Sequence, residues 1–160
     1  KFFQKRITIL FGEMGFRQDI INASMTNELD PFSIFERMNQ MTRLYNSTDG
    51  NSFLKAFKRL SSLTEDLKND NLITTLFIKE EEKILCNLLN DFRDRIEKEG
   101  SNFIFDNFQY LNKLTKSIDE FFDNVIVNDE NIEIRRNRKI LIYQFHKIFN
   151  ENFKFSLLEV

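Results

Sequence analysis

The stretch KEEEKILCNLLNDFRDRIEK, residues 79–98, decides the fold class. Its apolar residues recur three and four positions apart, a spacing that places them on one face of an α-helix. They are Ile84, Leu85, Leu88, Leu89, Phe92 and Ile96. Three glutamates near its beginning favour the positive end of a helix dipole, and Gly100 is a suitable residue to end the helix. The stretch therefore predicts a long amphipathic helix.

Helical periodicity continues on both sides of this stretch. We expect further helices over residues 2–14, 17–25, 31–45, 52–63, 72–78, 101–115, 117–124 and 130–150. Asp30 before Pro31 predicts a helix start, because aspartate caps a helix and proline fits its first position. Residues 46–51 (NSTDGN) have the composition of a loop, which makes Ser52 the expected cap of the next helix.

The same periodicity predicts which apolar residues the first helices bury. The expected core residues of these helices are Phe3, Ile7, Leu10, Phe11, Phe32, Phe35, Met38 and Met41. The chain has 160 residues, of which 41 % are hydrophobic, and it contains only four Gly and one Pro. This composition predicts a single all-α domain over residues 1–160, which we expect to be a bundle of seven to nine helices. The polar segment 64–71 is a possible hinge. Because the chain begins with Lys1, we expect it to be a fragment of a longer protein.

Catalytic and metal-binding chemistry have few candidate residues. One Cys excludes an internal disulfide and one His excludes a His-rich zinc site, while no glycine-rich phosphate loop or metal-ligand spacing is present. Cys86 and His146 could pair as nucleophile and base, but Cys86 lies among leucines, where a buried inert thiol is more common. We expect no catalytic residue, no metal and no cofactor in this chain. No run of residues is long and apolar enough to span a bilayer, so we expect a cytoplasmic protein with no membrane partner.

Charge is unevenly distributed along the chain. The net charge of −2 argues against indiscriminate coating of nucleic acid. Residues 1–60 nevertheless carry +3, residues 61–134 carry −9 and residues 135–160 carry +4. A basic patch therefore requires the two ends of the chain to meet in space.

The helix predicted over 130–150 has a basic face. On a helical wheel Arg135, Arg136, Lys139 and Tyr143 lie opposite the apolar arc, as expected of a phosphate-binding surface with an aromatic for stacking, although a merely solvated face has the same pattern. Arg138 falls inside the apolar arc. It should be buried against a carboxylate or exposed carbonyls, in a structural role.

A second basic face occurs in the helix predicted over 52–63. Lys55, Lys58 and Arg59 lie opposite its apolar residues. If this face docks beside the segment from Arg135 to Lys139, the two faces form one continuous basic groove. The alternative is that the acidic middle segment neutralises it.

The block FFDNVIV, residues 121–127, is followed by the block RRNRKIL, residues 135–141. These two blocks resemble F-F-D-x-V-M-V and L-R-x-N-R-L-x-L-L, which occur at the C-terminal end of the β subunit of bacterial-type glycyl-tRNA synthetase. Upstream, GFRQDII (15–21), AFKRL (56–60) and the segment from Leu76 to Leu85 resemble further family motifs in the same order. Where the family's D-A-L precedes the arginine, this chain has Ile132, Glu133 and Ile134.

The resemblance implies a DALR-type anticodon-binding domain, with glycine tRNA and the α subunit of a heterotetramer as partners and no DNA. It also implies that the parent assembly is a glycine–tRNA ligase whose ATP and magnesium belong to the α subunit. Candidate RNA-binding residues are then Arg135, Arg136, Lys139, Tyr143, Lys55, Lys58 and Arg59, and candidate structural residues are Arg138, Phe121 and Phe122. The alternative function is a helical protein–protein interaction domain that docks an acidic partner or subunit. A third possible function is that of a free-standing Cys/His hydrolase.

Overall fold

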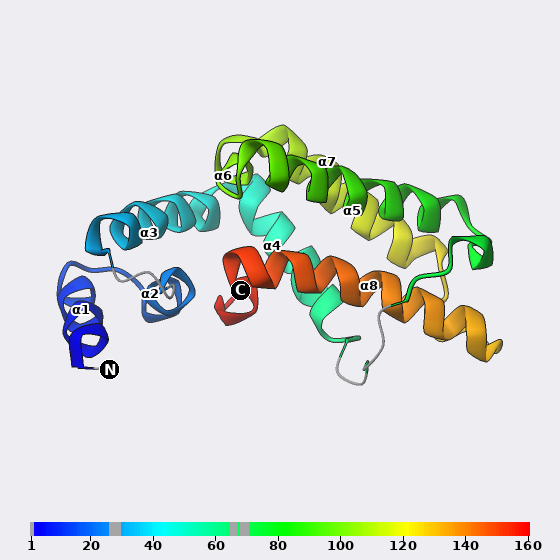
Figure 1. Cartoon of the computed structure of the whole chain (residues 1–160), viewed down its shortest axis with the longest axis horizontal. Helices are drawn as coiled ribbons and strands as arrows, with labels where there is room; N and C mark the ends of the chain where they lie inside the picture. Colours follow the sequence, from blue (N-terminus) through cyan, green and yellow to red (C-terminus); the bar gives the residue numbers. More distant parts are fainter. Residues whose placement is uncertain (1, 26–29, 65–66, 68–70) are drawn as a thin grey trace.

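The computed structural model describes residues 2–25, 30–64, 67 and 71–160, and of residues 2–4 only the backbone. Over these ranges the chain forms eight α-helices and two short 3₁₀ helices and contains no strand, which confirms the all-α prediction (Figure 1). The helices are α1 (Phe2–Glu13), α2 (Gln18–Ser24), α3 (Pro31–Asn46), α4 (Thr48–Ser61), η1 (Thr74–Leu76), α5 (Glu80–Glu99), α6 (Phe103–Asp106), α7 (Phe108–Asn124), α8 (Ile132–Phe153) and η2 (Phe155–Leu157). The hinge expected at 64–71 falls mostly on residues 65, 66 and 68–70, which lie outside the described residues.

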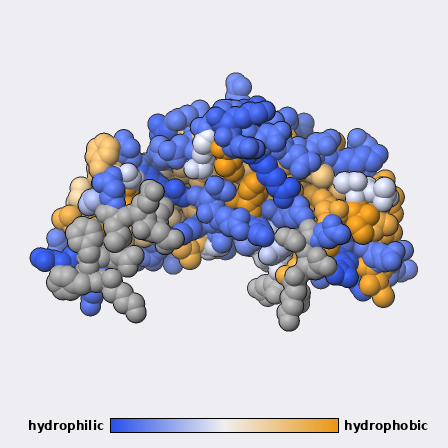
Figure 2. Space-filling model, viewed as in Figure 1, coloured by the Kyte–Doolittle hydropathy of each residue, from blue (hydrophilic) through white to orange (hydrophobic). Residues whose placement is uncertain are grey.

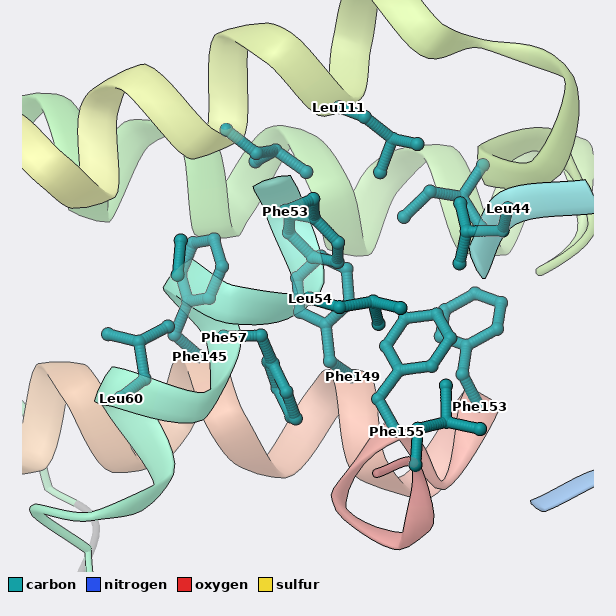
Figure 3. Packing of buried hydrophobic residues seen from close by; sticks show 14 of the residues in the cluster. Leu44, Phe53, Leu54, Phe57, Leu60, Leu111, Phe145, Phe149, Phe153 and Phe155 are labelled. Atoms are coloured by element: carbon teal, nitrogen blue, oxygen red, sulfur yellow. The ribbon is translucent and has the colours of Figure 1, made fainter. Parts of the chain in front are cut away.

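The core lies where α4 packs against both α7 and α8. Figure 3 shows phenylalanines of α4, α8 and η2 pointing toward one another in this space. Phe149 of α8 is at the centre, with ring centroids 4.1 Å from Phe92, 5.2 Å from Phe145 and 5.2 Å from Phe53. Offset and tilted ring pairs of this kind add to the free energy that burial alone provides. This packing fixes the orientation of α8 about its axis.

The first three helices form one end of an elongated, arched molecule, and α5, α7 and α8 extend toward the other end (Figures 1 and 2). α2 packs on α3 and on η2, so the beginning and the end of the chain are in contact. The carboxylate of Asp19 accepts a hydrogen bond from the backbone N–H of Glu159 at 2.8 Å. Arg17 and Tyr45 both donate to the carbonyl oxygen of Glu159 at 3.1 Å.

The prediction of a loop over residues 46–51 is wrong. α3 continues to Asn46 and α4 begins at Thr48, with Ser47 as the sole residue between them. The Ser47 hydroxyl accepts from the Gly50 N–H at 3.0 Å and donates to the Leu44 carbonyl at 2.8 Å, so one side chain serves both helix ends. Ser52 lies within α4 and is not its cap. The polar run is the end of one helix and the first turn of the next.

Three other segments differ from the prediction. Only Thr74–Leu76 of the segment 72–78 is helical, and it is a 3₁₀ turn. The helix predicted over 101–115 is divided at Asn107, whose side chain caps α7 by accepting from the Tyr110 N–H at 3.0 Å. The separate helix predicted over 117–124 is wrong: α7 continues through it, because Leu114, Ile118 and Phe121 prolong the same buried stripe.

Three residues expected in the core are exposed: Leu10, Phe32 and Ile84. α1 packs on α2, and among the described side chains of its apolar stripe Ile7 and Phe11 are buried. Phe32 lies in the first turn of α3 and Ile84 at the edge of the apolar face of α5. Nothing is described of the Phe3 side chain.

Candidate nucleic-acid interface

The first two turns of α8 carry polar side chains that point in different directions. α8 begins after Asn131, whose side chain accepts hydrogen bonds from the backbone N–H groups of Glu133 and Ile134. Because successive residues on a helix are rotated by about 100°, neighbours in sequence face different surroundings. Arg136, Asn137 and Arg138 consequently have three separate environments.

Arg138 is buried, with only 3 % of its side chain exposed, beside the fully buried Glu82 of α5. Its Nε donates to Glu82 Oε1 at 2.9 Å, and its Nη1 donates to Asp129 Oδ2 at 2.7 Å and to the Ile126 carbonyl at 2.9 Å. Burial by itself lowers the pKa of the guanidinium, but the two carboxylates outweigh it and raise the pKa above its ordinary value. This arginine is therefore charged, fully engaged within the protein and closed to a ligand.

Glu82 joins the same network to the start of α5. Its second oxygen accepts from the backbone N–H groups of Ile78 and Lys79, at 2.9 and 2.7 Å. The sequence suggested only a helix-dipole role for this glutamate. Its spacing of three residues after the capping position Lys79 is the signal that could have identified it.

Asn137 holds the segment before η1. Its Oδ1 accepts from the Ile73 N–H at 2.8 Å and its Nδ2 donates to the Ile73 carbonyl at 2.9 Å. An extended residue bonded on both sides in this way has no need of helical partners. This contact explains why the segment 72–78 is not a continuous helix, and it could not be predicted from local sequence.

Arg136 is exposed and lines two adjacent hollows. The first hollow, of about 320 Å³, is lined by Asn71, Ile73, Leu76, Glu133, Arg136, Asn137 and Ile140. The second hollow, of about 280 Å³, is lined by Ser62, Leu63, Leu67, Asn128, Ile132, Arg135, Arg136 and Lys139. Within the described ranges, neither Arg136 nor Lys139 has a hydrogen-bond or ion-pair partner, whereas Arg135 Nη1 donates to the Asp129 carbonyl at 3.3 Å. Both hollows are thus lined by a mixture of apolar and polar side chains. All three cations border the second hollow, and Arg136 also borders the first, together with Glu133.

Further along α8 the basic face is less exposed. Tyr143 is half-buried, with Lys147 Nζ 6.0 Å from its ring centroid. His146 stacks on Phe57 with a centroid distance of 5.2 Å, and burial lowers the pKa of its imidazole. His146 is therefore neutral near pH 7 and adds no positive charge to this face.

The three cations of α4 lie outside the linings of both hollows. Arg59 turns toward α7, where Nη1 bonds Asp119 at 3.2 Å and the guanidinium lies 4.6 Å from the Phe122 ring centroid. Lys58 Nζ donates to the Val160 carbonyl at 3.3 Å. Lys55 is exposed. The residues next to α4 that line the second hollow are Ser62 and Leu63, which follow directly after the helix.

The two phenylalanines of the FFD motif differ from each other. Phe121 is fully buried, and Phe122 is half-buried with its ring edge-on to Phe121 at 5.6 Å. Phe122 is covered by Arg59 and both rings pack within the protein.

No group of three or more His, Cys, Asp or Glu side chains that could hold a metal ion occurs in the described part of the chain. Cys86 is buried and burial raises the pKa of its thiol, which disfavours the nucleophilic thiolate. None of the helices described is long and apolar enough to cross a membrane.

Comparison with known proteins identifies the class to which this arrangement belongs. Residues 53–159 match the family model described as DALR anticodon binding domain, and the chain belongs to that family. This match confirms the class expected from the sequence motifs and covers α8 with both hollows.

Individual relatives extend the similarity toward the beginning of the chain. The chain is 32 % identical to the glycine–tRNA ligase beta subunit of Thermodesulfovibrio yellowstonii over 73 % of its own length and 17 % of that relative. It is 30 % identical to the glycine–tRNA ligase beta subunit of Buchnera aphidicola subsp. Schizaphis graminum, over 99 % of the chain and 23 % of the relative. The beta subunit of Clostridioides difficile is 26 % identical over 91 % of the chain and 21 % of the relative. The chain thus spans less than a quarter of the length of each of these relatives.

Proposed function

We propose that this chain is the anticodon-binding part of a glycine–tRNA ligase β subunit and that it binds the tRNA through the first half of α8. The observation that carries this proposal is the pair of hollows bordered by Arg135, Arg136 and Lys139, in a domain of the DALR family. We further propose that residues 1–160 act as one folded domain in the cytoplasm.

The binding mechanism follows from the chemistry of the site. Lys and Arg neutralise backbone phosphates, and bases of an unpaired loop can leave the stack and enter pockets or stack on aromatic side chains such as Tyr143. Arg136 and Lys139 are available for phosphates, whereas Arg138 is not. Lys55 and Lys58 are candidates for phosphates of the stem, farther along the RNA from the hollows.

In the proposed reaction of the parent assembly, this chain positions the tRNA and takes no part in the chemical step. Binding energy gained far from the reacting ester selects the tRNA and places its acceptor end on the partner. We propose an α subunit as that partner and as the place where ATP and magnesium act. No described residue of this chain is assigned to either.

The test is a charge reversal on α8, Arg135→Glu with Lys139→Glu, measured by fluorescence anisotropy with a labelled glycine tRNA. We expect this variant to bind at least tenfold more weakly and to lose about two units of the slope of log affinity against log salt. The matched control is Lys113→Glu with Lys116→Glu on α7, which changes the net charge equally without touching the hollows. Unchanged affinity in a folded α8 variant, or an equal loss in the control, would contradict the proposal.

A second candidate function is docking of a protein partner. Ile126, between α7 and α8, is 74 % exposed and Ile132, the first residue of α8, is 69 % exposed. Figure 2 shows apolar residues gathered at this end of the molecule. Exposed apolar patches often mark contacts with proteins. In that case Ile126→Ser, at a residue that lines neither hollow, would weaken assembly with the α subunit and leave tRNA affinity unchanged.

A further inference from the structure

A third hollow, of about 260 Å³, lies on α3 beside the link between α5 and α6. Its lining is mostly polar and consists of Ser24, Ser33, Ile34, Glu36, Arg37, Gln40, Ser101 and Asn102. Arg37 also donates to the carbonyl oxygen of Asn152, near the end of α8. At the helical rise per residue, about 24 Å of α8 separate Asn152 from Arg136. The third hollow is therefore distinct from the two hollows at the beginning of α8.

Arg37 is a half-buried cation with no ion-pair partner among the described residues. Its Nη2 bonds the Asn152 carbonyl, whereas its Nε is shielded from solvent and has no hydrogen-bond partner in the described part of the chain. Burial lowers the pKa of this guanidinium. Arg138, which is also enclosed, is held by the carboxylates of Glu82 and Asp129. Because an enclosed charge is normally paired, the polar hollow beside Arg37 is suited to an anion.

Neutral hydrogen-bond donors accompany Arg37 in the lining of this hollow. Gln40 lies three residues after Arg37 on α3, so the two side chains are neighbours on the helix surface. Ser101 and Asn102 come from the link between α5 and α6. Hydroxyl and amide groups together with a guanidinium are the donors that bind oxyanions in proteins. A volume of about 260 Å³ is below the usual range for larger organic ligands and suits a small ion with its water.

Glu36 restricts which oxyanion fits, because it is the one carboxylate among the lining residues. A carboxylate repels a fully ionised oxyanion but accepts a hydrogen bond from an oxyanion that keeps a proton. Near pH 7 inorganic phosphate always keeps at least one proton. Sulfate keeps none, and neither does the phosphodiester of a nucleic-acid backbone. An arginine beside a glutamate therefore favours inorganic phosphate over both.

We propose that the third hollow binds inorganic phosphate, with Arg37 Nε donating to one phosphate oxygen and the Glu36 carboxylate accepting from the phosphate O–H. Gln40, Ser101 and Asn102 donate to the remaining oxygens. A phosphate bound in this way joins α3 to the link between α5 and α6, so it stabilises the folded chain. This site goes beyond the proposed function, because a nucleic-acid backbone has no proton to donate to Glu36.

The experiment titrates the whole chain with inorganic phosphate at pH 7 and constant ionic strength, by calorimetry and by thermal melting. We expect saturable binding at a single site and a Tm that rises with phosphate concentration by mass action. Sulfate should bind about tenfold more weakly. Both salts also raise Tm through exclusion from the protein surface, an effect that does not saturate. A response that does not saturate, or that is equal for the two anions, would overturn the proposal.

Three variants test the assigned contacts. Arg37→Gln should weaken phosphate binding about tenfold, because a charge-assisted hydrogen bond is lost. The matched control is Arg43→Gln, which removes the same charge from an exposed residue of α3 outside the hollow and should keep the affinity. Glu36→Gln replaces the carboxylate with an amide that can donate, so sulfate should then bind nearly as well as phosphate. Retained affinity in Arg37→Gln, loss in the control, or unchanged rejection of sulfate in Glu36→Gln would contradict the proposal.

Discussion

Three consecutive residues of α8 show how the same kind of side chain takes different roles. Arg136 is exposed beside two hollows, Asn137 holds Ile73, and Arg138 is bonded to Glu82 and Asp129. Composition cannot separate these arginines, but the helical wheel can, because it assigns Arg138 to the apolar arc. Exposed Arg136 is therefore available to bind a ligand, whereas buried Arg138 stabilises the fold.

Arg138→Met should destabilise the protein far more than Arg136→Met. Removing Arg138 leaves the buried Glu82 carboxylate without its cation, a change that costs about 3–5 kcal/mol of unfolding free energy. Exposed Arg136 should cost about 0.5 kcal/mol or less. Urea denaturation followed by circular dichroism measures both. Adding Glu82→Gln to Arg138→Met should restore part of the loss, and equal midpoints for the two single variants would refute the structural role.

At the scale of the elements, the α3–α4 junction allows no extra residue. Ser47 serves both helix ends, and Gly50 in the first turn of α4 lies directly against them. A Cβ atom at position 50 would collide with the Leu44 carbonyl oxygen and lie 2.6 Å from Ser47 Oγ. Glycine is required here for space, although it sits within a helix.

Gly50→Ala should therefore destabilise the protein by about 1–3 kcal/mol, even though alanine favours helices. The control is Gly12→Ala in α1, where a Cβ atom meets nothing within 4 Å. That substitution should raise the unfolding free energy by about 0.5–1 kcal/mol, because alanine restricts the unfolded chain. Thermal melting of the two variants gives opposite shifts. A stabilised Gly50→Ala would show that the junction relaxes.

The elements that the sequence predicted well carry their own start and stop residues. Asp30 accepts from the Ser33 N–H exactly where the Asp-Pro pair predicts a helix start, and Gly100 ends α5 with a φ of 81°. The prediction of a helix over residues 72–78 was wrong because Ile73 is held by Asn137, which is 64 residues away in the sequence. Of the candidate site, the wheel gave the outward direction of Arg136 but not the hollows, which depend on where η1 and the end of α4 pack.

At the scale of the whole molecule, Asp19 links the second helix to the end of the chain. Burial opposes ionisation of its carboxyl, but hydrogen bonds from the Glu159 N–H, Arg17 and the Ile20 N–H outweigh burial and lower its pKa. The bond to Glu159 spans 140 residues of sequence. Such a contact contributes only when both ends of the fold are in place.

The lowered pKa fixes the direction of a pH dependence. The stabilisation by Asp19 is present above the ordinary carboxyl pKa of 3.8 and is lost as pH falls through the lower folded-state value. Asp19→Asn should therefore lower the unfolding free energy by about 1–2 kcal/mol near neutral pH and by progressively less as the pH falls below 3.8. Urea midpoints of both proteins across this range measure the difference. A difference that does not change with pH would show that the charge is unimportant.

The alternation of Arg136, Asn137 and Arg138 also limits how the gene can vary. Loss or gain of a single codon inside α8 would rotate every later side chain by about 100° against its surroundings. If the change precedes Arg138, the guanidinium that is now buried beside Glu82 would turn toward solvent. An apolar or polar neighbour would then occupy its place. Length changes within this helix should therefore be eliminated by selection even where substitutions of its outward residues are accepted.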